Sequence, residues 1–245
     1  MTTLTILIIA FFFIAMIYSS VGFGGGSSYL ALLAVMGTSV EIMRPTALLC
    51  NIIVVTGGVY IFYKEGKIDL KRSWPFLTAG VPLAFLGGFW KLDDALFFQI
   101  LGGCLIITSI FLWIKPRQVL QPKSGNLLLN LGLGSGVGFL SGLVSIGGGI
   151  FLSPILHILQ WDEAKKISAL ASLFILVNSI SGLAGQLTRG PSLDYHFVAP
   201  LLFAVLAGGQ FGSRLGAKRF NPLHIKRITA VLILVAGLNI LRDHL

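Results

Sequence analysis

Two glycine triplets, each set in an apolar stretch, are the segments of this sequence best suited to hold a solute. Gly24–Gly26 form the first triplet and Gly147–Gly149 form the second. Each glycine costs a helix roughly 1 kcal/mol relative to alanine, so the triplets predict two breaks in helical structure. A helix that begins after such a break offers free backbone N–H groups and the positive end of its dipole to an anion. A tight turn that lets helices pack closely is the competing interpretation.

Side chains near the two triplets add hydrogen-bonding groups that suit an oxyanion. Serine hydroxyls flank both triplets, and Asn51 and Asn178 follow them at similar distances inside apolar segments. Such groups can also bond to their own helix or to a neighbouring helix. The predicted substrate-binding set is Ser20, Gly24, Gly25, Gly26, Ser27, Ser28, Asn51, Ser145, Gly147, Gly148, Gly149 and Asn178.

The sequence lacks the residue patterns that indicate a proton relay, a metal site or a catalytic site. The nine acidic residues fall at the edges of apolar segments or in loops, which disfavours a proton relay of buried carboxylates. Cys50 and Cys104 are isolated in apolar runs, so the sequence contains no CxxC motif and no Cys/His cluster that indicates a metal. No convincing nucleophile–base set is present either. We therefore expect no catalytic residue, no metal and no cofactor.

The composition places these residues in a membrane protein. Of 245 residues, 55% are hydrophobic and 11% are charged, and the mean hydropathy is +0.90. A soluble domain carries roughly 25% charged residues. Eight of ten successive apolar segments have the ~17–25 residues that cross a bilayer, whereas segments 27–37 and 150–160, each directly after a glycine triplet, are too short. The predicted fold is an all-α integral membrane protein with about eight full spans and two short, glycine-broken or re-entrant helices.

The two halves of the chain carry the same signals in the same order. The segment Val21–Gly26 matches Val144–Gly149 at an offset of 123 residues, and Gly87 matches Gly212 at an offset of 125. Similar signals at nearly one spacing indicate an internal repeat. We expect a first membrane repeat at residues 1–115, a cytoplasmic linker at 116–124 and a second membrane repeat at 125–245.

The positive charges indicate how the two repeats are oriented. If each short segment returns the chain to the side from which it came, 14 of the 18 Lys and Arg residues fall on one side of the membrane. If the short segments continue the preceding helices, the split is 9 to 9. The positive-inside rule favours the first arrangement, which puts both termini outside the cytoplasm and inverts the second repeat. The net charge of +9 then reflects topology, and nucleic-acid binding is not expected.

The motifs around the triplets resemble those of the TauE/SafE family of sulfite and organosulfonate exporter-type permeases. The similar segments are VGFGGGSSYLALLAVMG at 21–37, SGLVSIGGGIFLSPILHIL at 141–159, SALASLFILVNSISGLAG at 168–185 and the region of Gly212–Gly216. The resemblance implies a bacterial inner-membrane permease with two inverted halves that moves sulfite, sulfoacetate or a related anion. Pro45, Thr46 and Ala47 stand where the second repeat has only Ala171 and Ser172, so this part of the site differs between the repeats.

Together these patterns predict a secondary transporter for a small anion. In this hypothesis the two glycine breaks form one central site, and rocking of one half against the other exposes it to each side in turn. The expected partners are the anionic substrate and the lipid bilayer, and a homodimer is left open. A membrane scaffold or assembly protein without a transported substrate is the alternative, although it does not explain two polar-lined breaks.

Overall fold

Helices are the regular secondary structure of the described residues, and short loops and turns connect them. The computed structural model describes residues 3–20, 22–113, 126–190, 193–219 and 222–244, so the expected linker at 116–124 lies outside it. The helices are α1 (Thr3–Ser19), α2 (Gly26–Val35), α3 (Val40–Lys64), α4 (Leu70–Phe89), α5 (Asp94–Leu112), α6 (Leu127–Val144), α7 (Gly149–Ile158), α8 (Ala164–Leu187), α9 (Tyr195–Arg219) and α10 (Pro222–His244). They correspond one to one to the ten apolar segments, which confirms the all-α prediction.

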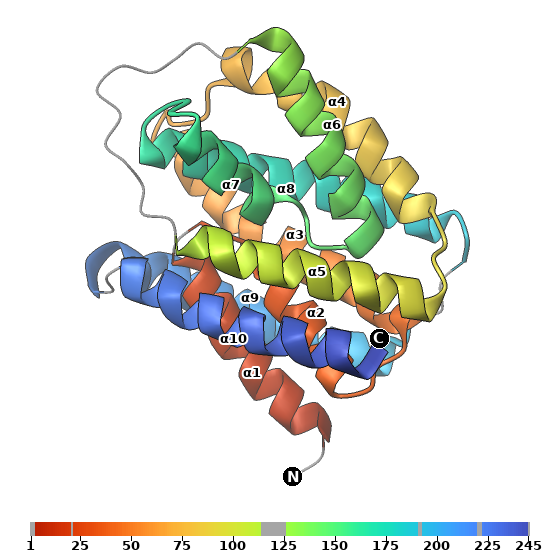
Figure 1. The fold of residues 1–245 in the computed structure, drawn as a ribbon. Coiled ribbons are helices and arrows are strands. Elements are labelled where there is room, and N and C mark those ends of the chain that lie inside the picture. Colours follow the sequence, from red (N-terminus) through yellow and green to blue (C-terminus); the bar gives the residue numbers. More distant parts are fainter. Residues whose placement is uncertain (1–2, 21, 114–125, 191–192, 220–221, 245) are drawn as a thin grey trace.

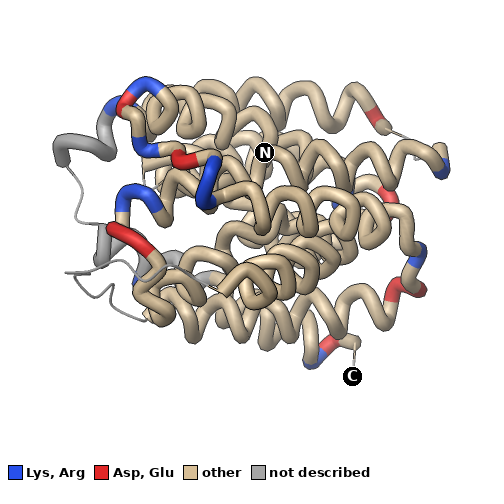
Figure 2. Tube along the Cα trace, turned by 90° about the horizontal axis from the view of Figure 1, so that it is seen from above, with Lys and Arg blue, Asp and Glu red and all other residues tan. Residues whose placement is uncertain are grey.

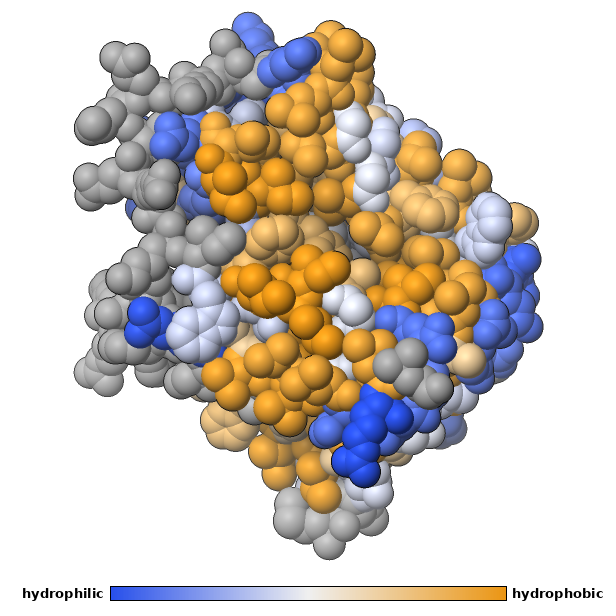
Figure 3. Space-filling view, in the orientation of Figure 1, coloured by the Kyte–Doolittle hydropathy of each residue, from blue (hydrophilic) through white to orange (hydrophobic). Residues whose placement is uncertain are grey.

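The surface of the bundle fits a lipid bilayer around its middle. Charged residues gather toward the two ends of the helices (Figure 2), and apolar side chains cover the middle of the face in Figure 3. Exposed aromatic residues stand near helix ends, as interfacial Trp and Tyr do in membranes. They are Tyr63, Trp74, Trp90, Trp113 and Tyr195.

Five helices of the described chain are long and apolar enough to cross a membrane, namely α3, α5, α6, α8 and α9. The protein is therefore a multi-pass membrane protein. The larger number of eight full spans remains a prediction, because α1 has only 17 residues and α4 carries Lys71 and Arg72 in its first turn. The two short helices, α2 and α7, have 10 residues each, as their segments predict.

The most extensive packing joins helices from different halves of the sequence. Helix α4 packs along α6, α1 along α9 and α5 along α10. Figure 1 shows α4, α6, α7 and α8 on one side of the molecule and α1, α2, α9 and α10 on the other. Glycines allow this closeness: a Cβ atom at Gly138 would lie 2.6 Å from the Cα atom of Gly80, and one at Gly208 would overlap the carbonyl group of Phe12.

The helix contacts repeat with a shift of five helices. The α4–α6 contact corresponds to α9–α1, α4–α8 corresponds to α9–α3, and α2–α3 corresponds to α7–α8. One close approach repeats in the same way, because a Cβ atom at Gly87 would overlap the carbonyl oxygen of Phe139 and one at Gly212 would overlap that of Met16. These two glycines are the pair that the sequence relates by 125 residues. The packing therefore follows a two-fold pattern, while the orientation of the repeats in the membrane remains a prediction.

Candidate functional site

The two glycine triplets begin the two short helices. Gly25 precedes α2 and Gly148 precedes α7, with φ angles of +85° and +79°. Glycine reaches this left-handed conformation without steric cost, and neither helix start has a side-chain cap. The first N–H groups of both helices therefore stay free of capping side chains, as the sequence predicts for two broken helices.

Asn51 of α3 is wedged between the two breaks. A Cβ atom at Gly24 or at Gly26 would overlap the Asn51 amide group, and one at Gly147 would lie 3.0 Å from its nitrogen. The Asn51 amide donates a hydrogen bond of 3.1 Å to the carbonyl oxygen of Ile146, just before the second triplet. The structure thus brings both triplets and Asn51 to one junction, which includes a further contact: a Cβ atom at Gly26 would lie 2.9 Å from Ile146 O.

This junction is tightly packed. A cavity of about 10 Å³ lies between Gly24–Ser27 and the residues Ile146, Ile150 and Ile175. Such a volume holds no more than about one water molecule. An anion at the junction therefore requires the two breaks to move apart.

The other predicted residues differ in their burial and in their hydrogen-bond partners. Ser27 is buried, and its hydroxyl lies 3.4 Å from that of Tyr18, which also bonds Ser28 at 2.8 Å. Ser20, the residue after α1, donates to the carbonyl oxygen of Ile17, so its hydroxyl bonds the last turn of that helix. Asn178 of α8 is fully buried, and both atoms of its amide group lack a hydrogen-bond partner among the described residues.

The remaining glycines of the second triplet pack against α8. A Cβ atom at Gly148 would lie 2.9 Å from the ring of Phe174, and one at Gly149 would lie 2.5 Å from Ile175. On the other side, the hydroxyl of Ser172 on α8 donates to the carbonyl oxygen of Gly22, just before the first triplet. Each long helix, α3 and α8, therefore contacts the break that belongs to the other half.

A cavity of about 470 Å³ lies at one end of the α3–α8 interface. We name it the Arg44 cavity. It is lined by residues from the start of α3 (39–45), from the region that joins α4 to α5 (88–94) and from the end of α8 (186–190). The start of α3 thus faces the end of α8, so these two helices run antiparallel.

Arg44 lies at the wall of this cavity with 8% of its surface exposed. Its Nε atom donates to the hydroxyl of Ser145 at 3.3 Å, and its Nη2 atom donates to the carbonyl oxygen of Gly142 at 3.4 Å. The amide nitrogen of Gln186 donates to the same Ser145 hydroxyl at 2.8 Å. Ser145, a predicted site residue with a φ angle of +63°, therefore connects the second break to two polar side chains of the cavity.

Sequence reasoning did not identify Arg44 as a site residue. It lies at the edge of an apolar segment, where a cation is typical of a loop that faces water. The spacing between Arg44 and Asn51 could have identified Arg44 as a site residue. The two positions differ by seven, which places both side chains on one face of α3.

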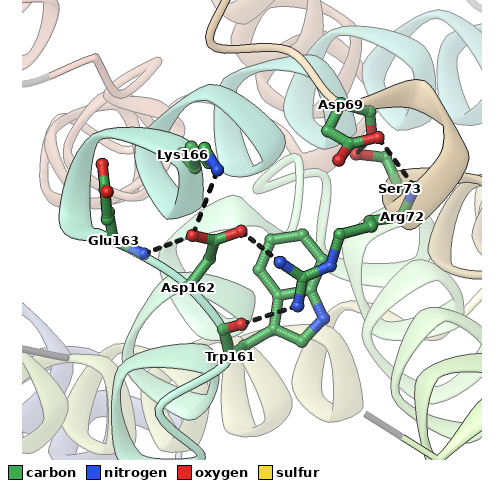
Figure 4. Close-up of polar contacts among 7 residues, drawn as sticks. All are labelled: Asp69, Arg72, Ser73, Trp161, Asp162, Glu163 and Lys166. Carbon is green, nitrogen blue, oxygen red and sulfur yellow. Dashed lines mark hydrogen bonds and ion pairs between the residues drawn. The ribbon is translucent and has the colours of Figure 1, made fainter. Parts of the chain in front are cut away.

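A polar cluster lies at the starts of α4 and α8, opposite the ends that line the Arg44 cavity (Figure 4). The carboxylate of Asp162, with none of its side chain exposed, pairs with Arg72 of α4 and lies 3.5 Å from the Lys166 ammonium group. Arg72 also donates to the carbonyl oxygen of Trp161 at 2.8 Å and lies over the Trp161 ring. The start of α4 and the start of α8, from different halves, are therefore tied together. The sequence suggested an ordinary loop position for Asp162, whereas the structure buries it.

Replacing Arg72 with alanine is expected to destabilise the protein by about 3 kcal/mol, because it leaves a buried carboxylate with only part of its charge compensated. For a chain of this size, this corresponds to a fall in Tm of roughly 6–12 °C in detergent. Lys91→Ala is the matched control, since the Lys91–Glu41 pair is exposed and spans 4.0 Å. Exposed pairs contribute about 0–1 kcal/mol. Equal Tm values for the two variants would contradict the structural role of the cluster.

The comparisons with known proteins agree with this description. The family model for the sulfite exporter TauE/SafE matches residues 7–240. The chain is 33% identical to the "probable membrane transporter protein y4hK" of Sinorhizobium fredii, covering 96% of this chain and 97% of the relative. It is also 26% identical to the "probable membrane transporter protein YjnA" of Bacillus subtilis, over 94% of this chain and 96% of the relative, and 26% identical to a relative of the same description from Methanocaldococcus jannaschii, over 96% and 94%. No solved structure matches the chain.

These relatives are described as probable membrane transporters, and the chain shares their multi-pass helical character. The chain belongs to the TauE/SafE sulfite exporter family, since the family model covers nearly all of it. The resemblance that its glycine motifs suggested is therefore confirmed.

Proposed function

We propose that this protein is a secondary transporter that carries a small anion, sulfite or an organosulfonate such as sulfoacetate, across the bacterial inner membrane. Its substrate site forms where the two glycine breaks meet, from the predicted set of residues. The observation that carries this proposal is the contact of one side chain, Asn51, with both breaks. A membrane scaffold has no need of two helix starts without caps that converge on one buried amide.

Inverted repeats are part of the proposal. The two-fold pattern of helix contacts and the antiparallel arrangement of α3 and α8 support them. The cluster of Arg72, Asp162 and Lys166 places the start of α8 at the same end as the start of α4, as expected if each short helix returns the chain to the side from which it came. With the positive-inside rule, this end is cytoplasmic and both termini are periplasmic.

The packing suggests which bodies move during transport. Helices α4, α6 and α8 contact one another, as do α1, α3 and α9, and the two groups meet at the α3–α8 interface. Each group contains helices from both repeats. Alternating access then moves these two interleaved bundles against each other, which replaces the simpler expectation that the halves of the sequence rock as units. The structure has its large cavity at the end of this interface that we assign to the periplasm, and its charged cluster at the other end.

A thermal-shift screen in detergent, paired with flux into proteoliposomes, tests the function. The screen uses sulfite, sulfoacetate, thiosulfate, taurine and carboxylates. An anion at 100 times its Kd is expected to stabilise the protein by about 2.7 kcal/mol through mass action. The same anion is expected to cross the vesicle membrane only when the protein is present. Absence of any ligand-specific shift together with absence of flux would favour the scaffold.

A further inference from the structure

We propose that Arg44 recognises the transported anion, and that the Arg44 cavity first holds it as an organic oxyanion whose head group lies on the guanidinium. This inference rests on the proposed function, since it names the residue and the ligand class for the periplasmic end of the same pathway. It adds a binding position that lies apart from the glycine junction.

Arg44 is a buried cation without an anionic partner. No Asp or Glu of the described residues lies within ion-pair distance of its guanidinium. The guanidinium donates hydrogen bonds to the Ser145 hydroxyl and the Gly142 carbonyl oxygen at 3.3 and 3.4 Å and lies over the Phe97 ring, 5.6 Å from its centroid, and all of these partners are uncharged. A buried charge is costly unless it is paired. By contrast, the buried Asp162 at the other end is paired with Arg72. An oxyanion ligand would supply the missing charge, and a guanidinium binds such a group with two parallel hydrogen bonds.

Gln186 provides a second group that is not satisfied. It lines the cavity with 6% of its surface exposed, and its Oε1 atom has no hydrogen-bond partner among the described residues. Its Nε2 atom bonds the Ser145 hydroxyl at 2.8 Å. Rotation of the amide by 180° exchanges these atoms, so that Ser145 donates to the oxygen and the amide N–H groups turn toward a ligand on Arg44.

The size and the walls of the cavity indicate the ligand class. About 470 Å³ falls within the range of small-molecule sites, and it exceeds what a bare inorganic ion fills. Val40, Trp90 and Leu92 give it an apolar wall. The charged residues of its lining are Arg44, Lys91 and Arg189 together with Glu41 and Asp94, and Glu41 lies 4.0 Å from Lys91, so the cations exceed the carboxylates by one. An oxyanion with a short organic group, such as a sulfonate, matches a cation at the floor and an apolar wall.

The cation is present in one repeat only. Asn51 and Asn178 are 127 residues apart, and the same offset from Arg44 leads to Ala171. In the second repeat the equivalent contact to a break is made by a hydroxyl, from Ser172 to the Gly22 carbonyl oxygen. The pathway therefore binds the anion with a full charge at its periplasmic end and with neutral groups farther along.

Arg44→Gln tests the inference, with sulfoacetate and sulfite as the probes. We expect the Kd to rise by at least about tenfold, because a charged hydrogen bond corresponds to roughly 10–100-fold in affinity. The Tm of the unliganded variant should stay the same or rise, since an unpaired buried charge is removed. Arg44→Lys should bind with intermediate affinity. Lys67→Gln, with the same change in charge in the loop after α3, is the control and should bind as the parent protein does.

Ser39→Cys locates the bound anion. Ser39 is exposed at the cavity and both native cysteines are buried, so a thiol reagent should label position 39 selectively. Sulfoacetate should slow this labelling when Arg44 is present and should not slow it in Arg44→Gln. Suppose that the parent protein binds the probes, that Arg44→Gln binds them with the same Kd, and that sulfoacetate still slows labelling at position 39 in Arg44→Gln. This result would overturn the inference and leave the proposed function intact. Failure of the parent to bind either probe would overturn both.

Discussion

Gly142→Ala is expected to lower the Tm by roughly 6–12 °C in detergent or to prevent folding altogether, although it adds a single methyl group. A Cβ atom at Gly142 would lie 2.8 Å from the carbonyl carbon of Ala84 and from the amide nitrogen of Gly88, and it would overlap the Ala84 carbonyl oxygen. All three atoms belong to the backbone of α4, which cannot yield as a side chain does. Overpacking costs about 1–3 kcal/mol where side chains adjust, so this case lies at or above the upper end.

Gly136→Ala is the control for this experiment. Gly136 is on the same helix and is exposed, and a methyl group added there would have no atom of the described residues within 4 Å. Because alanine favours helix by about 0.5–1 kcal/mol over glycine, this variant should be as stable as the parent or slightly more stable. Equal destabilisation of the two variants would show that α6 does not pack on α4 as described.

The double variant Gly25→Val, Gly148→Val is expected to reduce transport to the level of empty vesicles while the chain still inserts in the membrane. Both positions have positive φ angles that a β-branched residue adopts only under strain. A Cβ atom would also lie 3.1 Å from the Tyr29 ring at position 25 and 2.9 Å from the Phe174 ring at position 148. The starts of α2 and α7 must therefore shift, and with them the junction around Asn51. Flux measurements in proteoliposomes, normalised to inserted protein, give the result.

Gly37→Val, Gly66→Val separates damage to the site from general backbone strain. These glycines also have positive φ angles, +70° and +63°, but nothing in the described part of the chain lies within 4 Å of the added Cβ atoms. The control should lose some stability, about 1–3 kcal/mol per strained residue, and keep its transport rate. If the first double variant transports as fast as the parent, the glycine breaks do not form the substrate site.

Much of the fold could be predicted from the sequence, because two of its determinants can be read from short segments. These are the number of apolar residues needed to cross a bilayer and the destabilisation of a helix by glycine. The ten helices follow from runs of apolar residues, and the starts of α2 and α7 follow from the triplets. Asn51 could be named as a site candidate because an amide within a span must find a partner inside the bundle. What brings it to both triplets, however, is the packing of α3 against α2 and against α8, which contacts the second triplet and α7.

Other features depend on contacts between distant segments, which no local pattern contains. The burial of Arg44 results from the meeting of the start of α3 with the end of α8 and the α4–α5 region, and Asp162 is buried because Arg72 of α4 reaches across to it. In sequence, both are charged residues at helix ends. Likewise, the offset of 125 residues relates equivalent glycines, but it does not reveal that the tightest helix pairs cross from one repeat to the other.

The contact between α1 and α9 can form only late in the synthesis of the chain. Helix α1 ends at Ser19 and α9 ends at Arg219, so about 10–40 s of synthesis separate them at 5–20 residues per second. During this time the nascent chain holds its first helix in lipid without the helix whose glycines will pack against Phe12 and Met16. Chains interrupted before residue 195 never gain that partner, and they are expected to be the forms that membrane quality-control proteases remove.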